Sequence, residues 1–123
     1  MAPAFERTPP ASGPLVQGFA GRGFRIDGIA YEGALLTPER ATAWDAPSLA
    51  DLSLSDVELV LAANPEFLLL GTGAMQGFPP RAFVTALEER GIGVEAMDSR
   101  AAARAWAMLR GEGRWIAAAL MPL

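Results

Sequence analysis

The sequence contains no cysteine, no histidine and no lysine. Without the first two residue types the chain has no thiol nucleophile, no imidazole general base, no disulfide and neither of the commonest zinc ligands. All ten basic side chains are arginines and the net charge is −4, so no basic stripe is present to follow a phosphate backbone. We therefore expect no metal site, no cofactor and no nucleic-acid partner.

Long hydrophobic runs are also lacking. The two most apolar stretches are residues 59–70, which a polar Asn-Pro-Glu segment interrupts, and residues 115–123. Neither provides the roughly 20 apolar residues of a membrane-spanning helix. The N-terminus has no basic region followed by the apolar run of about 7–15 residues that a secretory signal needs. These absences predict a cytoplasmic protein that is not embedded in a membrane.

The composition is that of a compact domain. Apolar residues make up 51% of the 123 residues and charged residues 20%, which excludes the disordered class. The length fits one domain. Residues 1–14 contain four prolines and little periodicity, so we expect an extended or disordered arm there and a single domain over residues 15–123.

A hairpin signal lies within residues 23–33. Asp27-Gly28 can supply the two positive φ angles of a type I′ turn, which pairs Ile26 with Ile29. The hairpin then places four large apolar side chains on one surface, which we expect to face the core: Phe24, Ile26, Ile29 and Tyr31. Residues 34–37 and 41–44 are expected to add one or two strands around a turn at Pro38.

The second half of the chain alternates between helical and strand patterns. The expected helices begin at a capping box formed by Ser55 and Glu58, after Pro80, and at Asp98 or Ser99. The expected strands cover residues 66–70, 92–97 and 114–121. Residues 67–70 form a continuous apolar run, typical of a strand buried on both faces, so we place this strand at the centre of the sheet. Trp106 and Trp115 are both expected in the core.

This order of elements predicts the fold class. Strands that alternate with helices require right-handed crossovers and parallel pairing, whereas the N-terminal hairpin must be antiparallel. We expect an α/β domain of the three-layer type. Its mixed β-sheet would combine an N-terminal antiparallel hairpin with a C-terminal β-α-β-α-β segment, and helices would cover the sheet.

The segment most suited to ligand binding is the glycine-rich stretch at residues 71–78, GTGAMQGF. It leaves the carboxyl end of the most apolar strand and leads into a helix, where free amides and Arg81 could hold a phosphate or carboxylate. Its spacing is one residue longer than the dinucleotide fingerprint, and Pro79 and Pro80 lack the amides that a phosphate needs. A structural turn is the favoured interpretation. A nucleotide or another small anionic ligand stays open.

Loops that follow neighbouring parallel strands open on the same edge of a sheet, so several polar residues are expected to lie near this segment. The candidate binding residues are Thr72, Gly73, Gln76, Arg81, Ser99 and Arg104. The alternative is that Ser99 caps a helix and that Arg104 is a surface charge. No catalytic residues are expected, so we favour a binding or assembly protein over an enzyme. Catalysis by carboxylates, arginine or a bound cofactor stays open.

Four segments of the chain share a pattern with a known family. They are Gly23-Phe24 with Gly28 and Tyr31-Glu32-Gly33, then Leu69-Leu70-Gly71-Thr72-Gly73 with Gln76, then Gly91-Ile92-Gly93-Val94-Glu95, and finally Ala117-Ala118-Ala119-Leu120. Over residues 15–123 the chain resembles a family of small α/β domains of unknown function that includes a mitochondrial assembly factor of respiratory complex I. The resemblance implies a mixed sheet flanked by helices and a protein partner.

The chain departs from that family pattern around the third expected helix. Relatives carry a cysteine near the position of Ala102 and an aromatic-asparagine pair where this chain has Trp106-Ala107. The missing thiol and amide argue against a shared active site at this helix but do not affect the expected fold.

Overall fold

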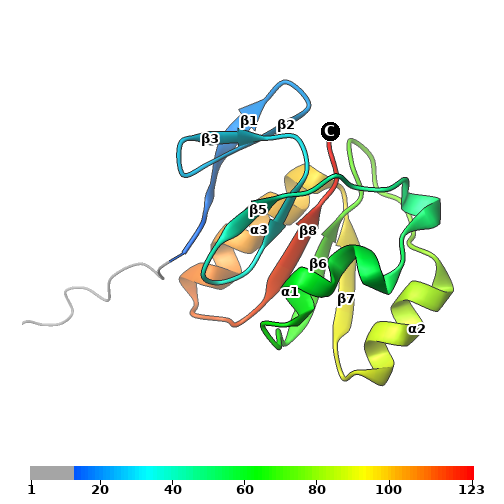
Figure 1. Cartoon of the computed structure of the whole chain (residues 1–123). Coiled ribbons are helices and arrows are strands. Elements are labelled where there is room, and N and C mark those ends of the chain that lie inside the picture. Colours follow the sequence, from blue (N-terminus) through cyan, green and yellow to red (C-terminus); the bar gives the residue numbers. More distant parts are fainter. Residues whose placement is uncertain (1–12) are drawn as a thin grey trace, which may run out of the picture.

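A computed structural model of the chain describes residues 13–123 (Figure 1). The arm expected over residues 1–14 therefore lies almost entirely outside the described residues. Pro14, its last residue, is buried, and its carbonyl oxygen accepts a hydrogen bond from Trp106 Nε1 at 2.8 Å. The described chain thus enters the fold already held against the third helix.

The strands form two sheets. The smaller is antiparallel, in the order β1-β2-β3, and contains β1 (Val16–Ala20), β2 (Gly23–Ile26) and β3 (Ile29–Tyr31). The larger has the order β5-β4-β8-β6-β7 and contains β4 (Ala34–Leu36), β5 (Ala41–Ala43), β6 (Phe67–Gly71), β7 (Gly93–Met97) and β8 (Ala117–Leu120). Strand β6 runs parallel to β7 and β8, while β4 runs antiparallel to β5 and β8, which confirms the mixed sheet.

Helices cover both faces of the larger sheet, as the three-layer prediction requires (Figure 1). The helices are α1 (Glu58–Leu61), α2 (Arg81–Glu89) and α3 (Ser99–Gly111), and two 3₁₀ turns, η2 (Leu49–Asp51) and η3 (Leu54–Val57), precede α1. Leu68 and Leu70 pack with Phe83 and Leu87 of α2. Side chains on a strand alternate between faces, so Leu69 and its neighbours in the opposite layer pack against α3 and the smaller sheet.

The N-terminal hairpin has the predicted register. Ile26 pairs with Ile29, and the turn between them has φ of 51° at Asp27 and 80° at Gly28. The prediction of a continuous core face is wrong at Ile29, which is 57% exposed, whereas Phe24 and Ile26 are fully buried. Its cross-strand partner Ile26 is fully buried, so the alternation of side chains along the strands does not decide burial at this position.

The predicted capping box at Ser55 and Glu58 is wrong. The same motif forms two residues earlier, where Asp56 Oδ2 accepts hydrogen bonds from the Ser53 amide at 2.8 Å and the Ser53 hydroxyl at 3.0 Å. This earlier start produces the 3₁₀ turn η3 and leaves α1 as a single helical turn. The helix ends before Asn64, as predicted, where φ is 53°.

Two further expectations need correction, one about strand order and one about burial. Strand β8, rather than β6, is the middle strand of the larger sheet, because two strands lie on each side of β8, whereas only β7 lies beyond β6. Trp115 is 41% exposed, and its Nε1 donates to the Ala63 carbonyl at 2.7 Å, so the indole lies against the segment after α1 rather than in the core. Trp106 is fully buried, as predicted. Within residues 13–123, no helix combines the length and apolar character needed to cross a bilayer.

Candidate functional site

The glycine-rich loop leaves the carboxyl end of β6, and the start of α3 lies beside it. Because β6 and β7 are parallel neighbours, the segment that follows β7 reaches the same edge of the sheet as the loop. The Ser99 amide donates to the Gly73 carbonyl at 2.8 Å, and the Thr72 amide donates to the Met97 carbonyl at 2.8 Å. The predicted proximity of Thr72, Gly73 and Ser99 is therefore observed.

The Ser99 hydroxyl joins three segments of the chain. It is fully buried, accepts a hydrogen bond from the Gly73 amide at 2.8 Å and donates one to the Met121 carbonyl at 2.7 Å. The helix cap is the preceding residue, Asp98, whose Oδ1 accepts from the Ala101 amide at 2.9 Å. A Cβ atom on Gly71 would lie 2.7 Å from Ser99 Oγ, so this packing requires glycine at position 71.

The Thr72 side chain makes hydrogen bonds to the backbone within the glycine-rich loop. Its hydroxyl donates to the Met75 carbonyl at 2.7 Å and accepts from the Gly77 amide at 3.0 Å. The amides of Gly73 and Gly77 are therefore both bonded to side-chain oxygens of the chain itself. A small anion at these amides stays a prediction, and it would have to replace these hydrogen bonds.

The tip of the loop is apolar and exposed. Met75 is 79% exposed and Phe78 is 86% exposed, whereas Gln76 between them is an exposed polar residue. A shallow hollow of about 280 Å³ lies beside the tip, lined by Phe78, Pro79, Arg81 and Val84. The residues predicted from the sequence in this segment are Thr72, Gly73, Gln76 and Arg81, and they do not include Met75 or Phe78. The available signal was two large apolar residues placed among glycines and prolines, outside any helical or strand period.

Arg104 lies elsewhere. It is exposed on α3 and lines a separate hollow with Val16–Phe19 of β1. The structure therefore brings Thr72, Gly73 and Ser99 together. Gln76 is exposed in the loop, Arg81 is exposed at the start of α2, and Arg104 is not part of this group.

An ion pair between Glu66 and Arg114 lies at the opposite end of strand β6 from the loop. Glu66 Oε1 accepts from Arg114 Nε at 3.0 Å and Nη2 at 2.9 Å, and Glu66 Oε2 accepts from the Trp115 amide at 3.1 Å. The bond from Arg114, followed by the bond from the Trp115 amide, lowers the pKa of the Glu66 carboxyl. The carboxylate raises the pKa of Arg114 in turn. This pair joins the segments that enter β6 and β8 and is structural.

The part of the chain that the structure describes contains no assembled set of metal ligands. No group of three or more acidic residues that could hold an ion occurs there. At the glycine-rich loop, the half-buried hydroxyl of Thr72 and the buried hydroxyl of Ser99 bond to backbone groups rather than to a side-chain base. The arrangement is suited to presenting the loop tip rather than to activating a nucleophile.

Comparison with known proteins gives the chain close structural and sequence relatives. An uncharacterised protein of Rhodobacter capsulatus is 36% identical and aligns with 100% of this chain and 94% of its own length. The crystal structure of a Bordetella parapertussis protein has a TM-score of 0.83 and 31% identity, and the match covers 94% of this chain and 100% of that one.

A third relative has a name that describes a role. The "NADH dehydrogenase [ubiquinone] 1 alpha subcomplex assembly factor 3" of Danio rerio is 32% identical over 115 residues, which are 91% of this chain and 66% of that protein. This chain spans 60–66% of the length of the vertebrate assembly factors of that name that it matches. The family model described as "Protein of unknown function (DUF498/DUF598)" matches residues 16–121. The chain belongs to this DUF498/DUF598 family.

Proposed function

We propose that this chain is a protein-binding protein of the assembly-factor type, which docks a partner through the tip of the glycine-rich loop. The observation that carries the proposal is the exposure of Met75 and Phe78, the two most exposed large apolar side chains among the described residues. Exposed apolar groups of this size cost solvation free energy unless a partner covers them. The relatives named as assembly factors support a protein partner.

The base of the loop is rigid, and this favours binding. The hydroxyls of Thr72 and Ser99 together hold Gly73, Met75 and Gly77 in place. Because these bonds form before any partner arrives, less conformational entropy is lost when the tip becomes ordered in a complex. Exposed methionine and phenylalanine side chains on a fixed base can act as anchors for an apolar pocket.

Arg81 defines the chemistry of the partner more closely. It is exposed at the start of α2, lines the same hollow as Phe78, and makes no ion pair among the described residues. An apolar pocket whose rim carries a carboxylate would cover Phe78 and pair with Arg81 at the same time. We therefore infer a partner protein with an apolar pocket and an acidic rim.

Photo-crosslinking tests this proposal. A benzoylphenylalanine at position 78 should capture a partner in host cells, and the purified partner should then bind wild-type protein directly. The double variant Met75→Gln, Phe78→Ser should weaken that binding by about 30-fold or more, the effect of losing an interface anchor. Leu59→Ser is the matched control, because Leu59 is also exposed but lies on α1.

Two results would contradict the proposal. The first is equal affinity of the partner for wild type and for the double variant. The second is a thermal shift caused by inorganic phosphate that Gln76→Ala or Arg81→Ala removes while the double variant keeps it. That second result would assign the loop to a small anionic ligand instead.

A further inference from the structure

A second candidate surface lies between β1 and α3, away from the loop tip. A hollow of about 150 Å³ is lined there by four consecutive residues of β1, Val16–Phe19, and by Ala103, Arg104 and Ala107 of α3. Within residues 13–123, strand β1 is an edge strand that pairs with β2 alone. Glycine and alanine form much of the lining, so an added chain could approach the backbone of β1 closely.

Two arginines border this hollow without an acidic partner. Arg104 lines it, and the Arg100 guanidinium, one helical turn earlier, lies 5.6 Å from the centre of the Phe19 ring. Over residues 13–123, neither makes an ion pair, whereas Arg90 pairs with Glu58 and Arg114 with Glu66. The hollow therefore combines a free strand edge with two positive charges that are not neutralised.

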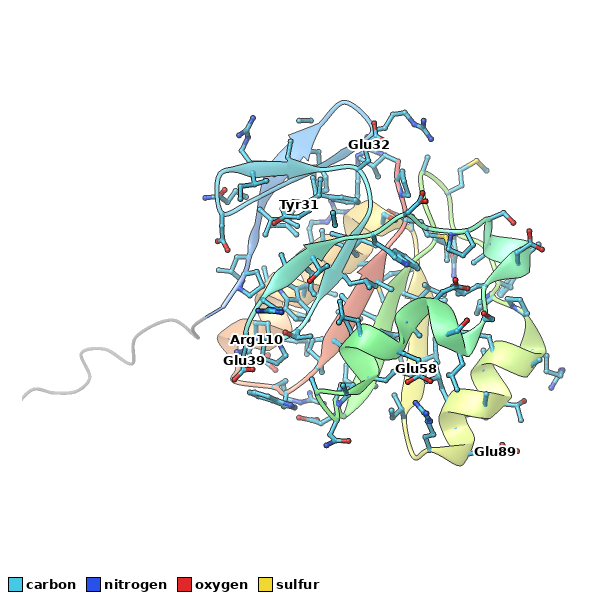
Figure 2. All side chains as sticks on the ribbon, viewed as in Figure 1. Tyr31, Glu32, Glu39, Glu58, Glu89 and Arg110 are labelled. Atoms are coloured by element: carbon cyan, nitrogen blue, oxygen red, sulfur yellow. The ribbon has the colours of Figure 1, made fainter. Side chains whose placement is uncertain are left out.

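Two of the acidic residues of the larger sheet's helices lie away from this surface. Glu58 on α1 and Glu89 at the end of α2 lie on the opposite side of the larger sheet from the smaller sheet (Figure 2). Glu58 is paired with Arg90, whereas Arg100 and Arg104 have no acidic partner among the described residues, so a ligand with negative charge is attracted to these two arginines.

The spacing of the two arginines matches an extended chain. Residues four apart on a helix are separated by about 6 Å along its axis. Alternate side chains of an extended strand point to the same side and are separated by about 7 Å. A strand with acidic residues at alternate positions can therefore present one carboxylate to Arg100 and the next to Arg104.

We propose that β1 and α3 bind an extended acidic segment of a partner protein. The segment adds a strand to the free edge of β1, and its alternate carboxylates pair with Arg100 and Arg104. A second copy of this chain fits less well. Among the described edge strands, β1, β3 and β5 contain no acidic residue and β7 contains only Glu95.

The test uses the full chain and a fluorescein-labelled peptide of eight residues with alternating valine and glutamate. We expect saturable binding by fluorescence anisotropy, and no binding of the same peptide with lysine in place of glutamate. Arg104→Glu and Arg100→Glu should each raise the Kd about tenfold. Ala107→Leu, which fills the hollow without changing the charge, should also weaken binding.

Matched controls separate this site from general electrostatics and from the loop. Arg40→Glu makes the same charge change at an exposed arginine after β4 and should leave the Kd near the wild-type value. The double variant Met75→Gln, Phe78→Ser should also bind the peptide normally, so the two proposals can fail independently. Circular dichroism of each variant checks that it is folded.

Nuclear magnetic resonance locates the peptide. The backbone amides that shift on titration should be those of residues 16–19 and 103–107. The proposal is overturned if the glutamate peptide does not bind, if Arg104→Glu and Arg40→Glu weaken binding equally, or if the shifts lie elsewhere. It is also overturned if a single-stranded oligonucleotide, rather than the peptide, binds with the Arg100 and Arg104 dependence.

Discussion

The Ser99 side chain is a structural hydroxyl whose importance arises from its position between three chain segments. Its two hydrogen bonds connect the glycine-rich loop, the start of α3 and the segment after β8, and the Ser99 side chain is fully buried. Polar groups that are buried in this way cost free energy when their partner is removed.

Ser99→Ala should therefore lower the free energy of unfolding by about 2–4 kcal/mol, because it leaves the Gly73 amide and the Met121 carbonyl without that partner. Urea denaturation monitored by circular dichroism measures the change. Thr85→Ala, at an exposed position of α2, is the control and should stay within about 0.5 kcal/mol of wild type. Equal stability of the two variants would show that Ser99 does not hold the loop.

Glu66 predicts a pH dependence with a definite sign. Its hydrogen bonds with Arg114 and the Trp115 amide lower its pKa in the folded state below the ordinary value of 4.5. The stabilisation is therefore fully present above that ordinary pKa and is lost as the pH falls through the lowered folded pKa. The stability difference between wild type and Glu66→Gln should be largest near neutral pH and should shrink in acid.

Urea midpoints of both proteins across the acidic range check this prediction. Because the pair is exposed, the difference should also decrease at high salt. A difference that grows on acidification would contradict the assigned cause.

At the scale of elements, the glycine-rich loop has a fixed base and an exposed tip. Gly73 has φ of +106°, and a Cβ atom there would lie 3.2 Å from the Pro122 carbonyl oxygen. Gly73→Val should lower the free energy of unfolding by about 1–3 kcal/mol, the usual cost of a strained backbone conformation. Gln76→Ala should be neutral within about 0.5 kcal/mol, since its side chain is exposed. Thermal melts of both variants distinguish the base from the tip.

Side chains of strand β6 pack on both faces of the larger sheet. Leu69 is buried between α3 and the smaller sheet, and its backbone pairs with β7 and β8. Leu69→Asp should lower the free energy of unfolding by about 4 kcal/mol or more, because a charge would be buried without a partner. Leu59→Asp, at an exposed position of α1, should have little effect. An unchanged melting temperature for Leu69→Asp would show that β6 is peripheral.

At the scale of the whole molecule, the two hydrophobic clusters share one sheet. Trp44 belongs to the cluster on the α1 and α2 side, and Trp106 belongs to the cluster on the α3 side. Both clusters include side chains of β6 and β8, so neither layer can lose its packing while the other keeps it. We therefore expect one cooperative unfolding transition.

Variants that keep a single tryptophan test this cooperativity. One keeps Trp44 and the other keeps Trp106, with phenylalanine at the remaining tryptophan positions. Within each variant, the fluorescence midpoint in urea should coincide with the circular dichroism midpoint. Fluorescence at Trp106 that changes before the secondary structure is lost would show that the smaller sheet and α3 unfold separately.

The elements with local signals were predictable from the sequence. The turn at Asp27-Gly28 and its register depend on backbone preferences of adjacent residues, and the alternation of strands and helices after residue 66 depends on periodicity and on glycine and proline stops. These local signals predicted the fold class and the meeting of Thr72, Gly73 and Ser99 at one edge of the larger sheet. The capping box was misplaced because two overlapping serine and acidic pairs have the same spacing, and only packing chooses between them.

The sequence by itself determined the order of elements, the hairpin, the mixed pairing and the absence of thiol and imidazole chemistry, since these depend on residue types and on neighbours along the chain. Only the tertiary structure decided that β8 is the middle strand, that Trp115 and Ile29 are exposed, and that Arg104 lies beside β1. It also decided that the side chains of Met75 and Phe78 are exposed while that of Ser99 is buried. Burial and strand order depend on contacts between residues distant in sequence, and no local pattern specifies them.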